Sequence, residues 1–407
     1  MMKMTKRAKK IEENFLTSNV FTFESSVCNC EETLISTNIS LQPMPAIRLT
    51  PDSNKRIHFA FGSKVGLVRL NEDGSIAESN ILGKLVAIKS NDIQAYCSFF
   101  ETNGFLFPIA VGTSEVIGIL ELQALVDRLR ATLELMSTIT DMSRTSYEKI
   151  VRMVFYHLFA PIVSVELNGG KYKYISDKHQ YSSFLESNKD ADRDARLNDT
   201  FNNTDFSFTD TITSFTMNAD FVDSVLNGTP ADSKYELPLF KEVFTVYCAP
   251  RAGKPKSMLF INDFVFHYLY EVGIIDYVDL HETHYVNDEL DKTRFEGRLK
   301  TAALETAKYI IKEEIEKNLQ RVRPTYSISK LEPAWKIDSL LSALYFGLFY
   351  MRPNMETYRR CANPKCGEFF LVPVSSKKKK YCCTACMNRD MAARKRARDK
   401  LNATKEQ

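Results

Sequence analysis

The sequence lacks the long apolar runs that membrane-spanning helices require. No stretch of its 407 residues reaches the roughly 18 to 20 consecutive uncharged apolar residues of such a helix. One candidate is interrupted by Arg152, His157 and Pro161, and the other, "SLLSALYFGLFYM", is only 13 residues long. The basic N-terminus, "MMKMTKRAKKIEENF", is followed by no apolar segment, so we do not expect a secretory signal. The sequence therefore predicts a cytoplasmic protein.

Motifs of common enzyme classes are also missing. Gly62-Ser63-Lys64 lacks the earlier glycine of a phosphate-binding loop, and no G-x-S-x-G nucleophile motif occurs. The segment "DLHETHYVNDEL" contains Asp279, His281, Glu282 and His284, in an order that differs from the H-E-x-x-H of zinc proteases. A polar loop explains it better than a second metal site, and no catalytic residue is predicted.

Charge is distributed unevenly along a chain whose net charge is only +3. Residues 375–407 contain eleven Lys or Arg against three acidic residues, a net charge of +8, which leaves −5 for the first 374 residues. A weakly acidic body with a strongly basic end indicates that this end meets a polyanion.

The pattern along the chain predicts an α+β protein with N-terminal strands, a mainly helical body and a small C-terminal finger. Strand-like alternation between Val20 and Arg69 gives way to helical patterns, and a hairpin turning at Asn168-Gly169 is expected. Helices are expected at about 90–104, 113–139, 146–159, 288–323 and 333–350. The predicted domains are 1–110, an α+β region; 111–352, the helical body, with a poorly ordered polar excursion at about 183–234; and 356–407, the finger.

Five of the nine cysteines lie between residues 361 and 386. Cys361 and Cys366 form one close pair, and Cys386 forms another with either Cys382 or Cys383. Two close pairs of thiols are the ligand pattern of structural zinc, so we predict Zn²⁺ on Cys361, Cys366, Cys382 and Cys386, with Cys383 as the alternative to Cys382. The segments "FFLVPV" and "KKKKY" are expected to form two strands before a basic helix, as in a treble clef. The other cysteines, including the C-x-C pair at 28 and 30, are expected to be scattered thiols.

The stretch "YRRCANPKCGEFF", followed by "YCCTACMNR" and a run of Arg and Lys, resembles the CGNR zinc finger of bacterial proteins. The resemblance covers about residues 358–398, with Met387 where the family has Gly. It implies zinc on the same four cysteines, a family aromatic at Tyr381 and the family Asn-Arg pair at Asn388 and Arg389. Those proteins are regarded as stress-linked transcription regulators, so the resemblance implies that function here.

Double-stranded DNA is the predicted ligand of the basic end, because cations on flexible stems neutralise phosphates and an exposed helix fits the major groove. Asn and Arg can also read base edges. The predicted contacts are Lys377, Lys378, Lys379, Lys380, Asn388, Arg389, Arg394, Lys395, Arg396, Arg398 and Lys400. RNA and an acidic protein partner are alternative ligands, and the body is expected to sense a signal or to form a homodimer. The alternative functions are a protein–protein adaptor with a structural zinc module and, third, a nucleic-acid-processing enzyme.

Overall fold

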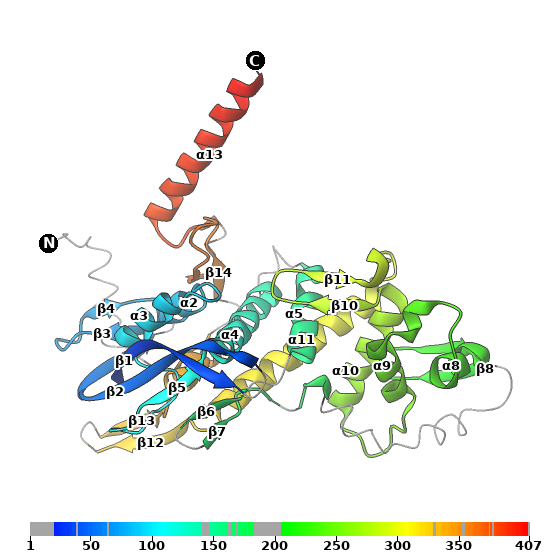
Figure 1. The fold of residues 1–407 in the computed structure, drawn as a ribbon, viewed down its shortest axis with the longest axis horizontal. Helices are drawn as coiled ribbons and strands as arrows, with labels where there is room; N and C mark the ends of the chain where they lie inside the picture. Colours follow the sequence, from blue (N-terminus) through cyan, green and yellow to red (C-terminus); the bar gives the residue numbers. More distant parts are fainter. Residues whose placement is uncertain are drawn as a thin grey trace. The chain divides into compact units, whose positions relative to one another are not determined.

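The computed structural model is mixed α/β, with an antiparallel sheet near the N-terminus (Figure 1). It describes residues 20–37, 40–62, 65–140, 146–160, 164–167, 170–176, 178–182, 205–328, 331–351, 355–373, 375–376 and 378–405. The contacts divide the chain into two compact units. The first unit comprises residues 1–133, 163–174 and 315–407, and the second comprises 134–162 and 175–314.

The sheet of the first unit is built around two long paired strands. Its strands are β1 (Phe21–Thr37), β2 (Ser40–Gly62), β3 (Gly66–Leu70), β4 (Ile76–Glu78) and β5 (Glu115–Gly118). They follow the order β1-β2-β3-β4, with β5 on β2, and every pairing is antiparallel. Phe21 and Phe61 are partners in the β1–β2 register, and their rings stack with centroids 5.1 Å apart. Aromatic cross-strand pairs of this kind stabilise a sheet. The strands predicted between Val20 and Arg69 are confirmed by β1, β2 and β3.

The first unit also contains helices, and most of them carry the rest of its core. They are α2 (Ile81–Leu85), α3 (Ile93–Asn103), α4 (Ile119–Thr140, shared with the second unit), α12 (Leu340–Phe349) and α13 (Thr384–Lys405). The apolar helix α12 packs on the sheet: the Phe346 ring lies 4.8 Å from that of Phe21, and a Cβ on Gly347 would lie 3.2 Å from the Phe61 ring. Nearly all of its side chains are buried, so α12 is a core helix of this unit.

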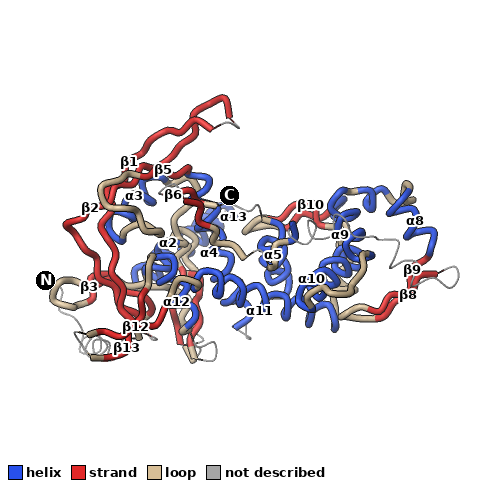
Figure 2. Tube along the Cα trace, turned by 90° about the horizontal axis from the view of Figure 1, so that it is seen from below, coloured by secondary structure: helices blue, strands red, loops and turns tan. Residues whose placement is uncertain are grey.

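Small hairpins complete the first unit. They are β6 (Val165–Leu167) with β7 (Gly170–Tyr172), β12 (Arg323–Ser327) with β13 (Glu332–Lys336), and β14 (Glu356–Arg360) with β15 (Phe369–Pro373). The first of these is the hairpin predicted from Asn168-Gly169, although the turn itself lies outside the described residues. Most of the strands belong to this unit, as the red segments of Figure 2 show.

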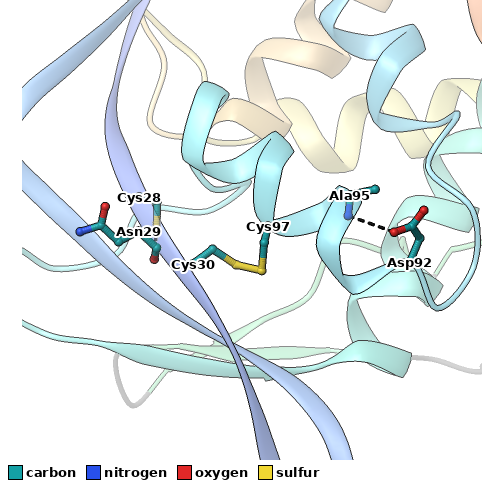
Figure 3. Close-up of a disulfide and its surroundings, with 6 residues drawn as sticks. All are labelled: Cys28, Asn29, Cys30, Asp92, Ala95 and Cys97. Carbon is teal, nitrogen blue, oxygen red and sulfur yellow. Dashed lines mark hydrogen bonds between the residues drawn. A yellow bond between two sulfur atoms is a disulfide. The ribbon is translucent and has the colours of Figure 1, made fainter.

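A disulfide joins Cys30 of β1 to Cys97 of α3, with their Cα atoms 5.1 Å apart (Figure 3). Phe21 and Phe23 face the core at odd positions, whereas Cys28 and Cys30 face it at even ones. A register shift between Ser26 and Cys28 explains the change, because a bulge moves the alternation by one residue. The prediction of scattered thiols is therefore wrong for Cys30, since a contact with a helix 67 residues away leaves no spacing signal.

The second unit is mainly helical. Its elements are α5 (Tyr147–Phe159), α8 (Ala219–Asn227), α9 (Pro238–Cys248), α10 (Lys256–His267), a π-helix (Tyr268–Val272), most of α11 (Gly297–Leu319), and the hairpins β8 (Asp205–Thr209) with β9 (Ser214–Asn218) and β10 (Ile275–Val278) with β11 (Thr283–Tyr285). The fully buried His267 lies between two carboxylates: its Nε2 is 2.7 Å from Asp210 and its Nδ1 is 2.6 Å from Glu271. This clamp ties the β8–β9 turn to α10.

Several predicted element boundaries are wrong. The helix expected from residue 113 begins at Ile119, because residues 115–118 pair with β2, and the helix expected from 333 begins at Leu340, because 332–336 form β13. The polar excursion contains the β8–β9 hairpin and α8, while 183–204 lie outside the described residues. Among the helices described, none is long and apolar enough to cross a membrane. The predicted domain boundaries remain a prediction.

Candidate metal centre

The first two cysteines of the cluster lie at the closed end of the β14–β15 hairpin. The register pairs Arg360 with Phe369, so residues 361–368 form the connection, and the Cys361 amide donates to the Glu368 carbonyl at 2.8 Å. Gly367 takes a φ of 67°, which glycine adopts without strain. Both thiols are therefore held in one tight loop.

Strand β15 contains the predicted "FFLVP", but its partner differs from the predicted one. It pairs with β14, which precedes the first cysteine, rather than with "KKKKY". Within the described residues of that basic stretch, Lys378 to Lys380 form a loop, and the Lys380 carbonyl accepts from the Ala362 amide at 2.9 Å. Successive lysines repel one another and have low strand propensity, which explains the loop.

The other two cysteines lie at the start of α13. Cys386 sits in the first turn, and its Sγ lies 3.5 Å from that of Cys382, just before the helix. The Asn363 side chain, buried in the opposite loop, donates to the Cys386 carbonyl at 3.5 Å. The helix start is thus attached to the hairpin loop.

The four sulfurs of Cys361, Cys366, Cys382 and Cys386 all lie within 4.8 Å of one another. The Sγ atoms of Cys366 and Cys382 are 3.7 Å apart, too far for a disulfide. Zinc–sulfur bonds of about 2.3 Å in a tetrahedron place sulfurs about 3.8 Å apart, so this donor set fits a four-coordinate metal ion. The group can hold a metal ion.

The fifth cysteine of the cluster, Cys383, is exposed and lies outside this group of four. Its Sγ is 3.9 Å from that of Cys382.

Without a cation, burial raises the pKa of the Cys366 thiol to about 12, whereas a bound metal would favour the thiolate.

A small core surrounds the four thiols. Phe370 and Val372 of β15 pack with Cys361 and Cys386, and Tyr381 lies against them. Because few large apolar side chains take part, a metal ion would supply much of the folding energy. We call residues 355–405 the cysteine module.

The cysteine module is docked on α2 of the same unit. The Asn80 amide donates to the Glu368 carboxylate at 2.6 Å and to the Phe369 carbonyl at 2.7 Å. The helix also approaches closely at Gly83, where a Cβ would lie only 1.8 Å from the Phe369 carbonyl oxygen. The Asn80 side chain therefore holds the hairpin at the Glu368 carboxylate and at the Phe369 carbonyl.

The predicted nucleic-acid contacts are exposed wherever their side chains are described. The exposed residues are Lys378, Lys379, Lys380, Asn388, Arg389, Arg394, Lys395, Arg396 and Arg398. Lys377 lies outside the described residues, as does the side chain of Lys400. Every side chain from Met391 to Asp399 is exposed, so this part of α13 presents all its faces.

Three positioning residues of the cysteine module were missed by the sequence analysis. Arg359 is buried and donates to the Ser376 carbonyl at 2.8 Å, which fixes the loop before the lysines. Asp390, also buried, accepts from the Tyr381 hydroxyl at 2.6 Å and pairs with Arg394 at 2.9 Å. One of only two acids inside a basic helix was the available signal for Asp390, and Asn363 before a proline was a turn signal.

The acidic and histidine residues at 279–284 are not brought together as a metal site. Asp279 accepts from the backbone amides of His281 and Glu282, as in a polar turn. His284 is exposed and lies 3.2 Å from the Glu282 carboxylate. Within the described part of the chain, the four cysteines are the one group found that can hold a metal ion.

No family model, curated protein or solved structure matches the chain. The resemblance to CGNR zinc fingers therefore remains a prediction.

Proposed function

We propose that the protein binds double-stranded DNA through its C-terminal helix, which a structural Zn²⁺ ion on the four clustered cysteines anchors to the body. A treble-clef-like finger would need a cysteine loop, a hairpin and a helix that carries the last two ligands. In support of the proposal, the described residues include a cysteine loop inside the β14–β15 hairpin and a helix whose first turn holds Cys386, with Cys382 just before it. The bacterial and regulatory part of the proposal comes from the resemblance to CGNR proteins.

Zinc is the metal that we propose because all four donors are sulfur. Thiolates select soft or borderline ions, and closed four-thiolate sites are typical of structural zinc. With all four positions filled by protein, the ion would have no open position for a substrate. Its role would be to fold the module and not to catalyse a reaction.

The observation that carries DNA binding is the exposure of α13 beyond its first turns. From Met391 to Asp399 no side chain is buried, so this segment lacks the apolar contact that usually stabilises a helix. Lys395 and Arg398, three residues apart, repel each other, whereas Arg394 pairs with Asp390 at 2.9 Å. A row of phosphates would remove this repulsion and would meet cations on every face of the helix.

Exposed residues nearer the metal centre would determine what the helix reads. Asn388 and Arg389 both reach solvent, and these residue types pair with adenine and guanine in the major groove. Lys378 to Lys380 would contact the backbone beside the helix. Specificity from so few base contacts would need a dimer or help from the body.

The test is fluorescence anisotropy with random-sequence duplex DNA at several salt concentrations. If about five phosphates are contacted, log affinity should fall with log salt at a slope of about −4.5. Replacing Lys395, Arg396 and Arg398 with Gln should reduce that slope by about 2.7. The matched control replaces three exposed lysines outside the module with Gln: Lys292, Lys308 and Lys312.

Equal losses in the tail variant and its control would contradict the assignment to α13. Absence of binding by the intact metal-loaded chain would contradict DNA binding itself. The protein–protein adaptor would then be favoured, since Met387 and Met391 are exposed one turn apart on α13. Exposed methionines are common on surfaces that bind peptides.

A further inference from the structure

A second feature of the first unit is a cavity of about 280 Å³ on the body, away from the cysteine module in sequence. Four segments line it: residues 107–108, the end of β7 at 172–174, the end of α11 at 317–321, and the start of α12 at 338–342. Its volume lies just below the range of about 300 to 1,000 Å³ of small-molecule sites. A ligand there would have to be small.

The lining of the cavity is rich in positive charge. Three cations line the cavity: Lys173, Lys317 and Arg321. Asp338 is the one carboxylate in its lining. The Arg321 guanidinium lies 3.7 Å from that carboxylate, a long ion pair that leaves donors for another acceptor. Three cations against one acid favour an anion in the cavity.

Asp338 gives a second indication of the chemistry of the ligand. Its Oδ1 atom is buried and has no hydrogen-bond partner among the described residues, while its Oδ2 faces Arg321. The Asp338 side chain as a whole is 28% exposed, so its carboxylate can still accept a hydrogen bond from a ligand. The occupant should therefore carry a hydroxyl or amine as well as a negative charge.

Backbone groups at the start of α12 contribute little to anion binding. The Leu341 amide already donates to the Leu106 carbonyl at 3.0 Å, and the Ser342 amide donates to the Ser339 hydroxyl at 3.1 Å. Side chains must then hold the charge, and the helix adds only its dipole.

An aromatic wall would support the uncharged part of a ligand. The rings of Phe107 and Tyr172 lie 5.1 Å apart, and the Arg321 guanidinium lies 4.9 Å from the Tyr172 ring. Stacking of this kind fixes the orientation of an arginine and leaves the edge of its guanidinium available.

We propose that this cavity binds a small phosphorylated metabolite of about the size of a sugar phosphate. Lys173, Lys317 and Arg321 hold the phosphate, and the Asp338 carboxylate accepts a hydrogen bond from a hydroxyl of the sugar. The site gives the body an effector that is independent of the DNA contacts on α13.

The test is isothermal titration calorimetry of the full-length chain with ribose 5-phosphate, inorganic phosphate and ribose as probes. Ribose 5-phosphate should bind more tightly than phosphate, and ribose should not bind. Lys317→Gln and Arg321→Gln should each weaken ribose 5-phosphate binding by at least about tenfold, the loss expected for one charge-assisted hydrogen bond. Asp338→Asn should weaken ribose 5-phosphate but not inorganic phosphate.

Two controls separate this site from other cations. Lys308→Gln, on an exposed part of α11, and the triple glutamine variant of α13 should both bind ribose 5-phosphate as the unmodified chain does. Thermal melts without ligand show whether each variant is folded. No binding of either phosphate by the unmodified chain, or loss of binding in the α13 variant alone, would overturn the proposal.

Discussion

Replacing Gly83 with alanine should separate the cysteine module from α2 without removing its metal. A Cβ at this position would lie 1.8 Å from the Phe369 carbonyl oxygen, whereas real Cβ atoms essentially never come closer than 3.0 Å. The clash involves backbone on both sides, so no side chain can rotate away. Strand β15 would have to move by at least about 1 Å.

The loss of docking free energy can be estimated from the hydrogen bonds that this movement breaks. The Asn80 side chain donates to the Glu368 carboxylate at 2.6 Å and to the Phe369 carbonyl, at the start of β15, at 2.7 Å. Bonds to a charged group contribute about 1.5 to 3 kcal/mol and neutral ones about 0.5 to 1.5 kcal/mol. We expect Gly83→Ala to weaken docking by about 2 to 4 kcal/mol, which raises the undocked population about thirtyfold or more.

Hydrogen exchange of the peptides that contain α2 and β15 is the assay, with metal content measured in parallel. Exchange in both peptides should accelerate in Gly83→Ala, and the metal should be retained, because the docking contacts broken are with Glu368 and Phe369, which are not among the four thiols. Gly228→Ala is the matched control, since a Cβ there would make only ordinary contacts of 3.5 Å. Unchanged exchange in Gly83→Ala would refute the reasoning, and so would loss of the metal.

Three further outcomes follow from the described contacts. Cys366→Ser should abolish metal binding, whereas Cys383→Ser should retain one ion per chain; metal analysis after gel filtration distinguishes them, and equal retention would contradict the ligand set. Burial lowers the pKa of His267, but hydrogen bonds to its two carboxylates outweigh it and raise that pKa, so the clamp stabilises the fold below the ordinary pKa of about 6.5. That stabilisation should be lost as pH rises through the raised value; urea titrations between about pH 6 and 9 should show a decline that is absent from His267→Gln. Cys97→Ser removes a cross-link across 67 residues and should cost about 4 kcal/mol of unfolding free energy, a loss that a reducing agent should reproduce only in the unmodified chain.

Features that depend on neighbours in sequence could be predicted. The spacing of Cys361, Cys366, Cys382 and Cys386 identified the four thiols that the structure brings together, because close pairs are local signals. Local alternation also predicted the N-terminal strands, and the apolar run at 340–349 predicted a buried helix.

Features that depend on distant partners could not be predicted. Residues 115–118 form a strand only because β2 provides an edge, although their own sequence continues the pattern of α4. The docking of Asn80 on a strand 289 residues away has no counterpart in the local sequence. The same is true of the cation-lined cavity, whose four segments are contiguous only in the fold.

In the cysteine module, the four thiols that can hold a metal ion are separate from the docking contacts. The Asn363 side chain joins the first turn of α13 to the hairpin loop, and Asn80 joins the hairpin to the sheet unit. From Met391 to Asp399 every side chain is exposed, and this segment contains four cations, of which Arg394 pairs with Asp390. A helix that is anchored at one end and destabilised by its own charge is stabilised most by a partner of opposite charge. The proposed binding to DNA should therefore depend strongly on salt because of how the helix is built and not only because of its composition.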